Sequence, residues 1–234
     1  MSTLGASAGV ARATSRPAAA GSVAVRLLPF ATALTVLGLA LLLLFVPPWV
    51  HLAMGLSGGD AWTATPQLAH ELSDRTIAEL FAGPGTFALA GPDGRSLYTA
   101  DEAAHLRDVR LVLYGFLALA AASAVGLAWA LRRHRADARA WRAVARGGAG
   151  LALALLVVGA IAALAFGAAF ELFHRLLFPG GNFAFPADSN LIRLYPLGFW
   201  QLSSAALGVL GVSGGLAAWW FGRRRAAALE LEAR

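Results

Sequence analysis

The chain has 234 residues, of which 58% are hydrophobic and 14% are charged, and its formal net charge is +6. This composition excludes an ordinary soluble domain and favours an integral membrane protein. The absence of cysteine excludes disulfides, thiolate metal sites and a cysteine nucleophile.

The N-terminal segment, residues 1–25, is rich in Ala, Ser, Gly and Arg without periodicity, so we expect a disordered tail. Four apolar stretches follow, at 27–45, 111–131, 151–173 and 199–221, and each is long enough to cross about 30 Å of hydrocarbon. The pattern predicts an all-α integral membrane protein whose four transmembrane helices form a membrane domain over residues 26–222. The first stretch is too long for a signal peptide and precedes Pro47-Pro48-Trp49 rather than small residues, so it predicts a retained anchor.

Apart from histidine, the basic residues are all arginine, and most lie before the first stretch, between the second and third, or after the fourth. Of the acidic residues, these segments contain only Asp137, Glu230 and Glu232. By the positive-inside rule, the middle link and both termini, including a tail at 223–234, should be cytoplasmic. Because membrane topology explains the arginines, no nucleic-acid partner is expected.

The two remaining connections, 51–108 and 175–198, should then face outward. The first is too long for a structureless loop and predicts a small extracellular cap. Within it, residues 67–81 have apolar side chains near helical spacing, which predicts an amphipathic helix. Residues 86–98, with the turn residues Gly-Pro-Asp-Gly at their centre, predict a short β-hairpin. The second connection is rich in Phe, Pro, Gly and Asn and should form an irregular aromatic shelf.

Two histidines, each three residues after a glutamate, are expected at the outer ends of the second and third helices. Thr99 and Glu102 fit a capping box, so a helix should start near Ala100 and hold His105 in its first turns. His174 closes the third apolar stretch. The link between these helices is short, so we expect antiparallel neighbours and two imidazoles side by side at one membrane surface.

These residues also have plainer interpretations. Ionisable residues at membrane depth are functional candidates, but Glu171 and His174 could simply lie in water just outside the hydrocarbon. Glu102 is explained by capping alone. Asp108 could either orient His105 or pair with a neighbouring arginine.

Other patterns are weaker. His51, His70 and His134 are poorer candidates for catalysis than the pair above. Two Glu-x-x-His motifs suggest a membrane metalloenzyme as one alternative, yet carboxylate di-metal sites lie in a bundle core and need further acids, which the first and fourth helices do not supply. A non-catalytic protein with a lipid- or protein-binding cap is another alternative. No G-x-S-x-G, P-loop or His-Glu-x-x-His motif is present, so a nucleophile supplied by the substrate is expected.

Two segments resemble the bacterial lipoprotein intramolecular transacylases. Residues 99–109, which contain Glu102, His105 and Asp108, are similar to that family's Glu-x-x-His-Met-x-Asp-Val segment, with Leu106 in place of Met. Residues 170–178, 183–188 and 191–199 resemble its second signature, with Phe183 where Trp is common. The resemblance covers four spans and both outer loops in order.

The resemblance implies four transmembrane helices with an extracellular cap in the bacterial cytoplasmic membrane, and an active site at the extracellular face. It implies transfer of the sn-2 acyl chain of a lipoprotein's diacylglyceryl-cysteine to that cysteine's own α-amino group, which gives the lyso form. His105 and His174 would be the catalytic pair. The partners would be diacylglyceryl-modified lipoproteins and membrane lipids, with no cofactor and no metal.

The chemistry agrees with this interpretation. A free α-amine titrates at about 7.7–8.0 and imidazole at about 6.5, so a neutral histidine can take the proton shed as nitrogen attacks the ester. A second histidine can donate to the oxyanion or to the departing alkoxide, although the sequence does not assign the two roles. Aromatic walls would hold acyl chains and exclude water. The residues expected to bind substrate are Asp108, Glu171, Phe178, Phe185, Asp188 and Tyr195, with Trp49 as a further wall candidate.

Overall fold

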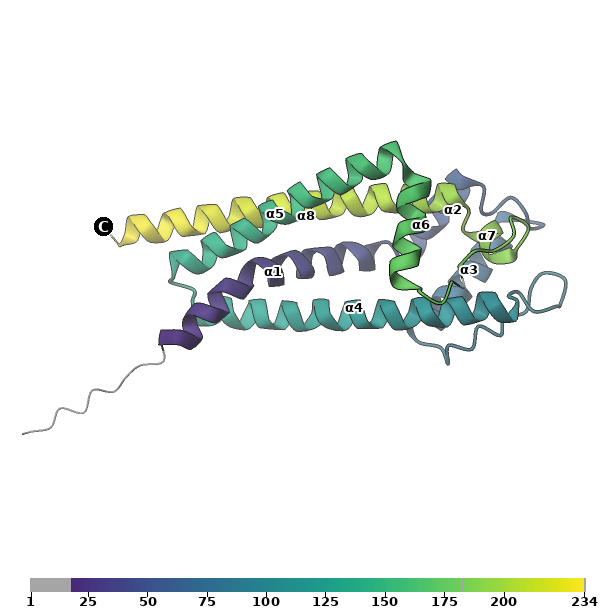
Figure 1. Cartoon of the computed structure of the whole chain (residues 1–234), viewed down its shortest axis with the longest axis horizontal. Coiled ribbons are helices and arrows are strands. Elements are labelled where there is room, and N and C mark those ends of the chain that lie inside the picture. Colours follow the sequence, from purple (N-terminus) through teal and green to yellow (C-terminus); the bar gives the residue numbers. More distant parts are fainter. Residues whose placement is uncertain (1–17, 182, 234) are drawn as a thin grey trace, which may run out of the picture.

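Four long helices run side by side and form the body of the molecule in the computed structural model, which describes residues 18–181 and 183–233 (Figure 1). They are α1 (Ala18–Leu43), α4 (Ala100–Arg133), α5 (Ala138–Leu164) and α8 (Leu197–Glu232). Among the described residues, these four are long and apolar enough to cross a membrane. The prediction of four membrane-spanning helices is therefore confirmed, and the chain is a multi-pass membrane protein.

The ends of the long helices differ from the sequence prediction. Helix α1 begins at Ala18, inside the predicted disordered tail of residues 1–25, and residues 1–17 of that prediction lie outside the described part of the chain. Helix α8 continues to Glu232 through the predicted tail at 223–234. The start of α1 and the end of α8 lie at the same end of the bundle (Figure 1). Their cytoplasmic location stays a prediction.

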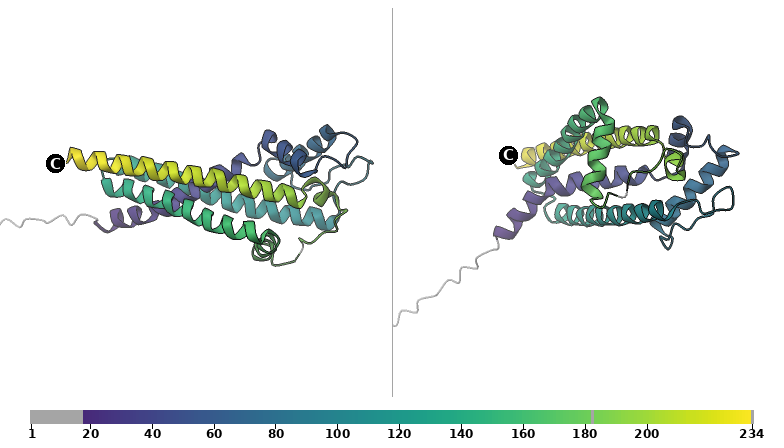
Figure 2. Two further views of the ribbon diagram at one scale, coloured as in Figure 1. Left: turned by 90° about the horizontal axis from the view of Figure 1, so that it is seen from above. Right: turned by 45° about the vertical axis from the view of Figure 1, so that its right-hand side comes forward.

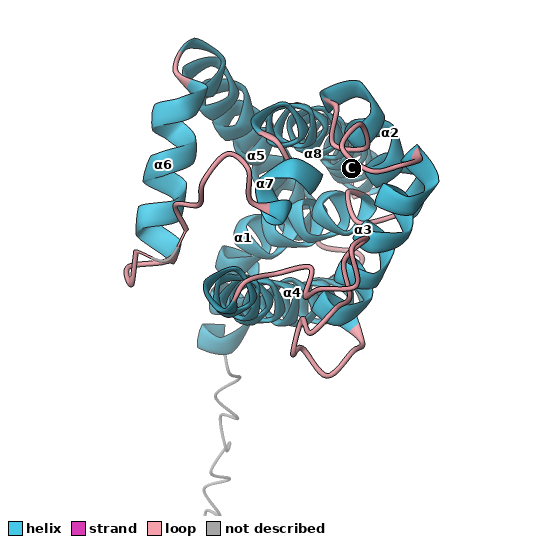
Figure 3. Cartoon of the chain, turned by 90° about the vertical axis from the view of Figure 1, so that its right-hand side faces the viewer, coloured by secondary structure: helices cyan, strands magenta, loops and turns pink. Residues whose placement is uncertain are grey.

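The long helices pack around α1 rather than as a simple hairpin. Helix α4 packs on α1, whereas α5 packs on α8 and on α1 (Figure 3). Two glycines allow the closest approaches, because an added methyl group would collide with the Pro29 backbone at Gly147 and with the Gly215 backbone at Gly148. The prediction that α4 and α5 are packed neighbours is therefore wrong, since α1 fills the space between them.

The third predicted span is not one continuous helix. Helix α5 ends at Leu164, Ala165 leaves the helical conformation with φ −148° and ψ 54°, and α6 (Phe166–Leu177) follows. Helix α6 crosses the long helices at a steep angle and reaches from the end of α5 towards α4 (Figures 1 and 2). The prediction of a single helix over 151–173 is wrong, and this break carries His174 across the bundle.

Three shorter helices gather at the opposite end of the bundle from the C-terminus, which we call the cap end (Figure 1). They are α2 (Pro47–Ser57), α3 (Pro66–Phe81) and α7 (Asn190–Leu194). They share a buried apolar core with the loop after α3 and with the starts of α4 and α8. Helix α3 confirms the predicted amphipathic helix. Helix α2, which begins at Pro47 and is followed by Gly58 as its C-cap with φ 77°, was not predicted.

The predicted hairpin over 86–98 is not confirmed as a pair of strands, since the described residues contain no strand. The segment does reverse direction, with an antiparallel bridge between Ala90 and Ser96 and a hydrogen bond of 2.7 Å from the Leu97 amide to the Leu89 carbonyl. Phe87 is the residue in this segment that departs from extended backbone. Its φ of 55° interrupts an extended run, its side chain is buried in the cap core, and its amide donates to Glu79 Oε2 at 3.2 Å. The segment is therefore anchored to the cap core through Phe87.

Candidate functional site

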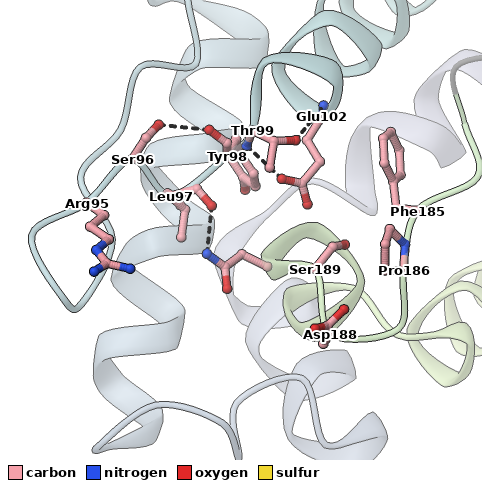
Figure 4. A pocket seen from close by; sticks show the side chains of 11 residues that line it. Arg95, Ser96, Leu97, Tyr98, Thr99, Glu102, Phe185, Pro186, Asp188 and Ser189 are labelled. Carbon is pink, nitrogen blue, oxygen red and sulfur yellow. Dashed lines mark hydrogen bonds between the residues drawn. The ribbon is translucent and has the colours of Figure 1, made fainter.

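The start of α4 positions the first histidine. The Thr99 hydroxyl accepts from the Glu102 amide at 3.2 Å, and the Glu102 carboxylate accepts from the Thr99 amide at 2.7 Å (Figure 4). This is the predicted capping box, and it fixes the first turn of the helix. His105 follows one turn later with 6% of its surface exposed. It is therefore held on a rigid element, as expected.

Helix α6 positions the second histidine, which is 9% exposed. His174 Nδ1 lies 2.8 Å from the carbonyl oxygen of Phe170, one turn earlier. A carbonyl oxygen can only accept, so Nδ1 must carry the hydrogen and donate it. The neutral ring then has its lone pair on Nε2.

The two imidazoles face each other, with ring centroids 6.0 Å apart and an angle of 27° between the ring planes. The sequence prediction that they arrive side by side is confirmed. His105 Nδ1 is buried and has no hydrogen-bond partner among the described residues. A buried unpaired ring nitrogen costs free energy, so it marks a position where a bound molecule would supply the missing partner.

Phenylalanine rings enclose the pair. Phe178 contacts both imidazoles, at centroid distances of 4.8 Å from His105 and 5.7 Å from His174. Phe185 lies 5.6 Å from His105, and Phe183 lies 5.3 Å from His174. The aromatic shelf predicted after α6 therefore covers the histidines.

Two rings from α6 itself also contact His174. Phe170 lies 4.2 Å from the His174 ring, and the mostly exposed Phe173 touches the edge of that ring at 5.3 Å; sequence reasoning did not single them out as its neighbours. The i,i+4 spacing of Phe170 and His174 on a helix was the available signal. With these rings around them, both imidazoles are buried.

A second role of Glu102 was also missed. Its carboxylate is 1% exposed, and Oε1 accepts from the Leu191 amide of α7 at 3.1 Å while Oε2 holds the cap. Asn190 adds a hydrogen bond from its side chain to the Leu97 carbonyl at 2.8 Å. These bonds fasten the loop that carries the aromatic shelf to the start of α4. They border a cavity of about 480 Å³ that is also lined by Phe185 and by the exposed Asp188 (Figure 4).

The other predicted binding residues lie at different distances from the pair. Asp108 is exposed one turn beyond His105 on α4 and acts electrostatically on it. Glu171 pairs with Arg175 at 2.6 Å, and both side chains are more than half exposed. Glu171 therefore sits on the solvent- or lipid-facing side of α6.

Tyr195 lies in the cap core rather than against an imidazole. Its hydroxyl is 2.9 Å from Ser73 Oγ, and burial raises its pKa to about 12. It therefore stays neutral and joins α3 to the segment before α8. Trp49 is half-buried against the same core, and its Nε1 is buried without a hydrogen-bond partner among the described residues.

A second histidine pair lies in the cap. His51 and His70, which we considered weak candidates for catalysis from the sequence, stack with ring centroids 4.2 Å apart and nearly parallel ring planes. Asp74 lies 2.9 Å from His51 Nε2, and Asp60 lies 3.7 Å from His70 Nε2. The pair joins α2 to α3 and is a feature of cap packing that spacing along the chain did not indicate.

The geometry gives no support to the metalloenzyme alternative. Both oxygens of Glu102 accept from backbone amides, and Glu171 pairs with Arg175. Over residues 18–181 and 183–233, no three His, Asp or Glu side chains gather as a metal site. The two Glu-x-x-His motifs therefore bring their histidines together but not their carboxylates.

Comparison with known proteins gives a consistent result. A sequence model of the family described as lipoprotein intramolecular transacylase Lit matches residues 26–200. The solved structure of the membrane integral lipoprotein intramolecular transacylase Lit from Bacillus cereus superposes with a TM-score of 0.77, at 15% identity, over 91% of this chain and 98% of that one. A variant of that protein with a histidine replaced by arginine superposes with a TM-score of 0.67, also at 15% identity, over 91% and 95%.

A curated relative is also similar in sequence. It is an uncharacterized protein of Aquifex aeolicus, 27% identical over 119 residues, which are 50% of this chain and 53% of that protein. The chain thus matches about half the length of this relative. The structural neighbours agree with the fold described above, and the family match covers both histidines.

Proposed function

Since this chain belongs to the lipoprotein intramolecular transacylase family Lit, we propose that it moves the sn-2 acyl chain of a diacylglyceryl-cysteine lipoprotein to that lipoprotein's own N-terminal amine. The observation that carries this proposal is the pairing of His105 and His174 inside a shell of phenylalanine rings. The product is the lyso form, in which the sn-2 oxygen is free and the nitrogen is acylated.

The histidines have different parts in this proposal. The amine nitrogen attacks the ester carbonyl, the new C–N bond forms, and the C–O bond to the glyceryl oxygen breaks. One proton leaves the nitrogen and one reaches the glyceryl oxygen. His174 is the base, because its Nδ1 is committed to the Phe170 carbonyl and its Nε2 is open to accept. His105 donates a hydrogen bond to the developing oxyanion or to the departing oxygen.

Exclusion of water supports transfer over hydrolysis. Water competes with the amine for the ester carbonyl, and the rings of Phe178, Phe183 and Phe185 leave it little room at the imidazoles. The amine and the ester belong to one molecule, so the protein's main task is to hold them in a ring-like geometry. Such positioning can supply about 7–11 kcal/mol of the barrier in well-oriented systems.

The site belongs at the extracellular face in this proposal, because the arginine-rich segments lie at the end of the bundle opposite the cap. Diacylglyceryl lipoproteins anchored in that leaflet would bring their headgroups level with the two histidines. Asp108 lies beside His105 and is proposed to orient it, and Asp188 borders the cavity next to Phe185.

Mass spectrometry of N-terminal lipopeptides from cells with and without this protein tests the proposal. We expect lyso-form peptides, with one acyl chain on glycerol and one on nitrogen, only when the protein is present. Identical lipopeptides in both samples would instead favour a non-catalytic protein with a lipid- or protein-binding cap.

A further inference from the structure

A groove of about 630 Å³ lies between α5 and α8, outside the shell of rings around the histidines. It occupies the halves of both helices nearest the cap end. Its lining is mostly small or apolar and includes Leu155, Gly159, Ala163, Gly208 and Val212. Ser204 and Gln201 add a few polar groups.

The groove exists because two helices that touch at one level separate further on. At Gly148 and Gly215 the backbones of α5 and α8 are in contact. Towards the cap end α5 diverges from α8 and then ends, as Figure 1 shows. Small residues line the widening gap, so side chains do not refill it. A methyl group added at Gly159 or at Gly208 would meet no other atom within 4 Å.

A row of rings connects the groove to the histidine pair. Phe166, at the start of α6, lines the groove. Its ring lies 5.9 Å from that of Phe170, and Phe170 lies 4.2 Å from His174. These three residues are spaced by four along α6 and share one face of that helix. An apolar surface therefore continues from the groove to the reacting imidazole.

The depth of the groove matches a lipid tail. Between Gln201 and Ser213 it follows α8 for about 18 Å at 1.5 Å per residue, slightly more than half of the ~30 Å hydrocarbon core. The groove thus spans the cap-side half of the membrane, where the tails of a lipid anchored at that face lie.

We propose that this groove holds the acyl chain that is transferred, the sn-2 chain, with its carbonyl at His174 and its tail between α5 and α8. This inference rests on the proposed function. It makes the groove the part of the protein that selects substrates by the length of their sn-2 chain. A long alkyl chain suits the lining because it needs no hydrogen-bond partners and packs against small side chains.

Filling the groove tests the inference. Gly208→Leu and Gly159→Leu place a branched side chain in open groove space, and both changes favour the helix. Gly126→Leu is the matched control, because Gly126 also faces open space but lies on α4 away from the groove. The purified full-length protein is assayed with synthetic diacylglyceryl-cysteine lipopeptides that carry palmitoyl at sn-1 and either palmitoyl or hexanoyl at sn-2.

We expect each groove variant to lower kcat/KM for the palmitoyl sn-2 substrate by about tenfold or more, and to change the value for the hexanoyl substrate by less than about twofold. Gly126→Leu should behave as the unsubstituted protein does. Equal losses on both substrates, unchanged kinetics on both, or a change in oligomeric state without a change in chain preference would each overturn the inference.

A binding measurement separates this inference from the proposed function. A lipopeptide with a diazirine near the end of its sn-2 chain should label residues 155–163 or 201–213, and Gly208→Leu should abolish that labelling. Labelling elsewhere with transfer intact would refute the groove and leave the function standing. Labelling in the groove without any transfer by the unsubstituted protein would refute the function and leave the groove standing.

Discussion

Glu102 and Leu191, 89 positions apart in the chain, are joined by a hydrogen bond of 3.1 Å from the Leu191 amide to the Glu102 carboxylate. The other carboxylate oxygen accepts from the Thr99 amide at 2.7 Å. One buried side chain thus caps the helix that carries His105 and also holds α7, which follows the aromatic shelf. The helix that carries His105 and the loop that covers it are aligned through this single group.

Replacing Glu102 should loosen both connections. In Glu102→Ala two amides lose their acceptor, and a buried donor without a partner costs about 1–3 kcal/mol. We expect a clear drop in the midpoint of thermal unfolding in detergent and a loss of transfer activity. Asp101→Asn is the control, since Asp101 is exposed in the same helical turn. If the two variants unfold at the same temperature, Glu102 does not have the role described.

Much of the fold followed from the sequence because its signals are local. Apolar length predicts the four spans, and the Thr99–Glu102 spacing predicts the start of α4. The break at Ala165 has no such signal, because the residues before it are mainly Ala, Ile and Leu, which are compatible with a continuous helix. The position of α1 between α4 and α5 depends on the close approach of Gly147 to Pro29, which no single segment reveals.

The site was predictable to a similar degree. Histidine spacing and the capping box predict the pair, and the composition of the loop predicts the rings of Phe178 and Phe185 near it. The bond between Glu102 and Leu191 was not predictable, because a buried carboxylate that serves two amides looks, in sequence, like an ordinary cap.

Phe178 should protect the reaction from water. It is buried and contacts both imidazoles, so Phe178→Ala opens space beside the ester carbonyl. We expect slower transfer together with increased release of free fatty acid, measured by mass spectrometry of both products. Phe173→Ala is the matched control, since Phe173 touches His174 but is mostly exposed. Equal fatty acid release from the two variants would argue against a shielding role for Phe178.

Asp108 and Glu171 should differ in importance although both lie near a histidine in sequence. Asp108→Asn removes the charge that acts on His105. We expect transfer to fall by about tenfold, which is at the low end of the losses caused by removing a carboxylate that orients a functional histidine. Glu171→Gln breaks an exposed pair with Arg175, which is worth about 0–1 kcal/mol, so activity and stability should hardly change. Initial rates of acyl transfer by both variants test these expectations. A larger loss of rate in Glu171→Gln than in Asp108→Asn would mean that Glu171, not Asp108, is the more important carboxylate.

Removal of metal should leave the reaction unaffected. The carboxylates of the two Glu-x-x-His motifs do not converge on a metal site. A chelator therefore removes nothing that the proposed mechanism uses. We expect the purified protein to keep its rate of transfer after incubation with EDTA and dialysis. Loss of activity that a divalent cation restores would favour the metalloenzyme alternative instead.

The pairing of His105 and His174 as the catalytic groups is tested by conversion of a synthetic diacylglyceryl lipopeptide by the purified protein and by its His105→Ala and His174→Asn variants. The asparagine amide can still donate to the Phe170 carbonyl, so that variant should fold while lacking a base. We expect the unsubstituted protein to form the lyso product, and both variants, with unchanged thermal unfolding, to form about a thousandfold less or none. Lyso product at the normal rate from either folded variant would contradict this expectation.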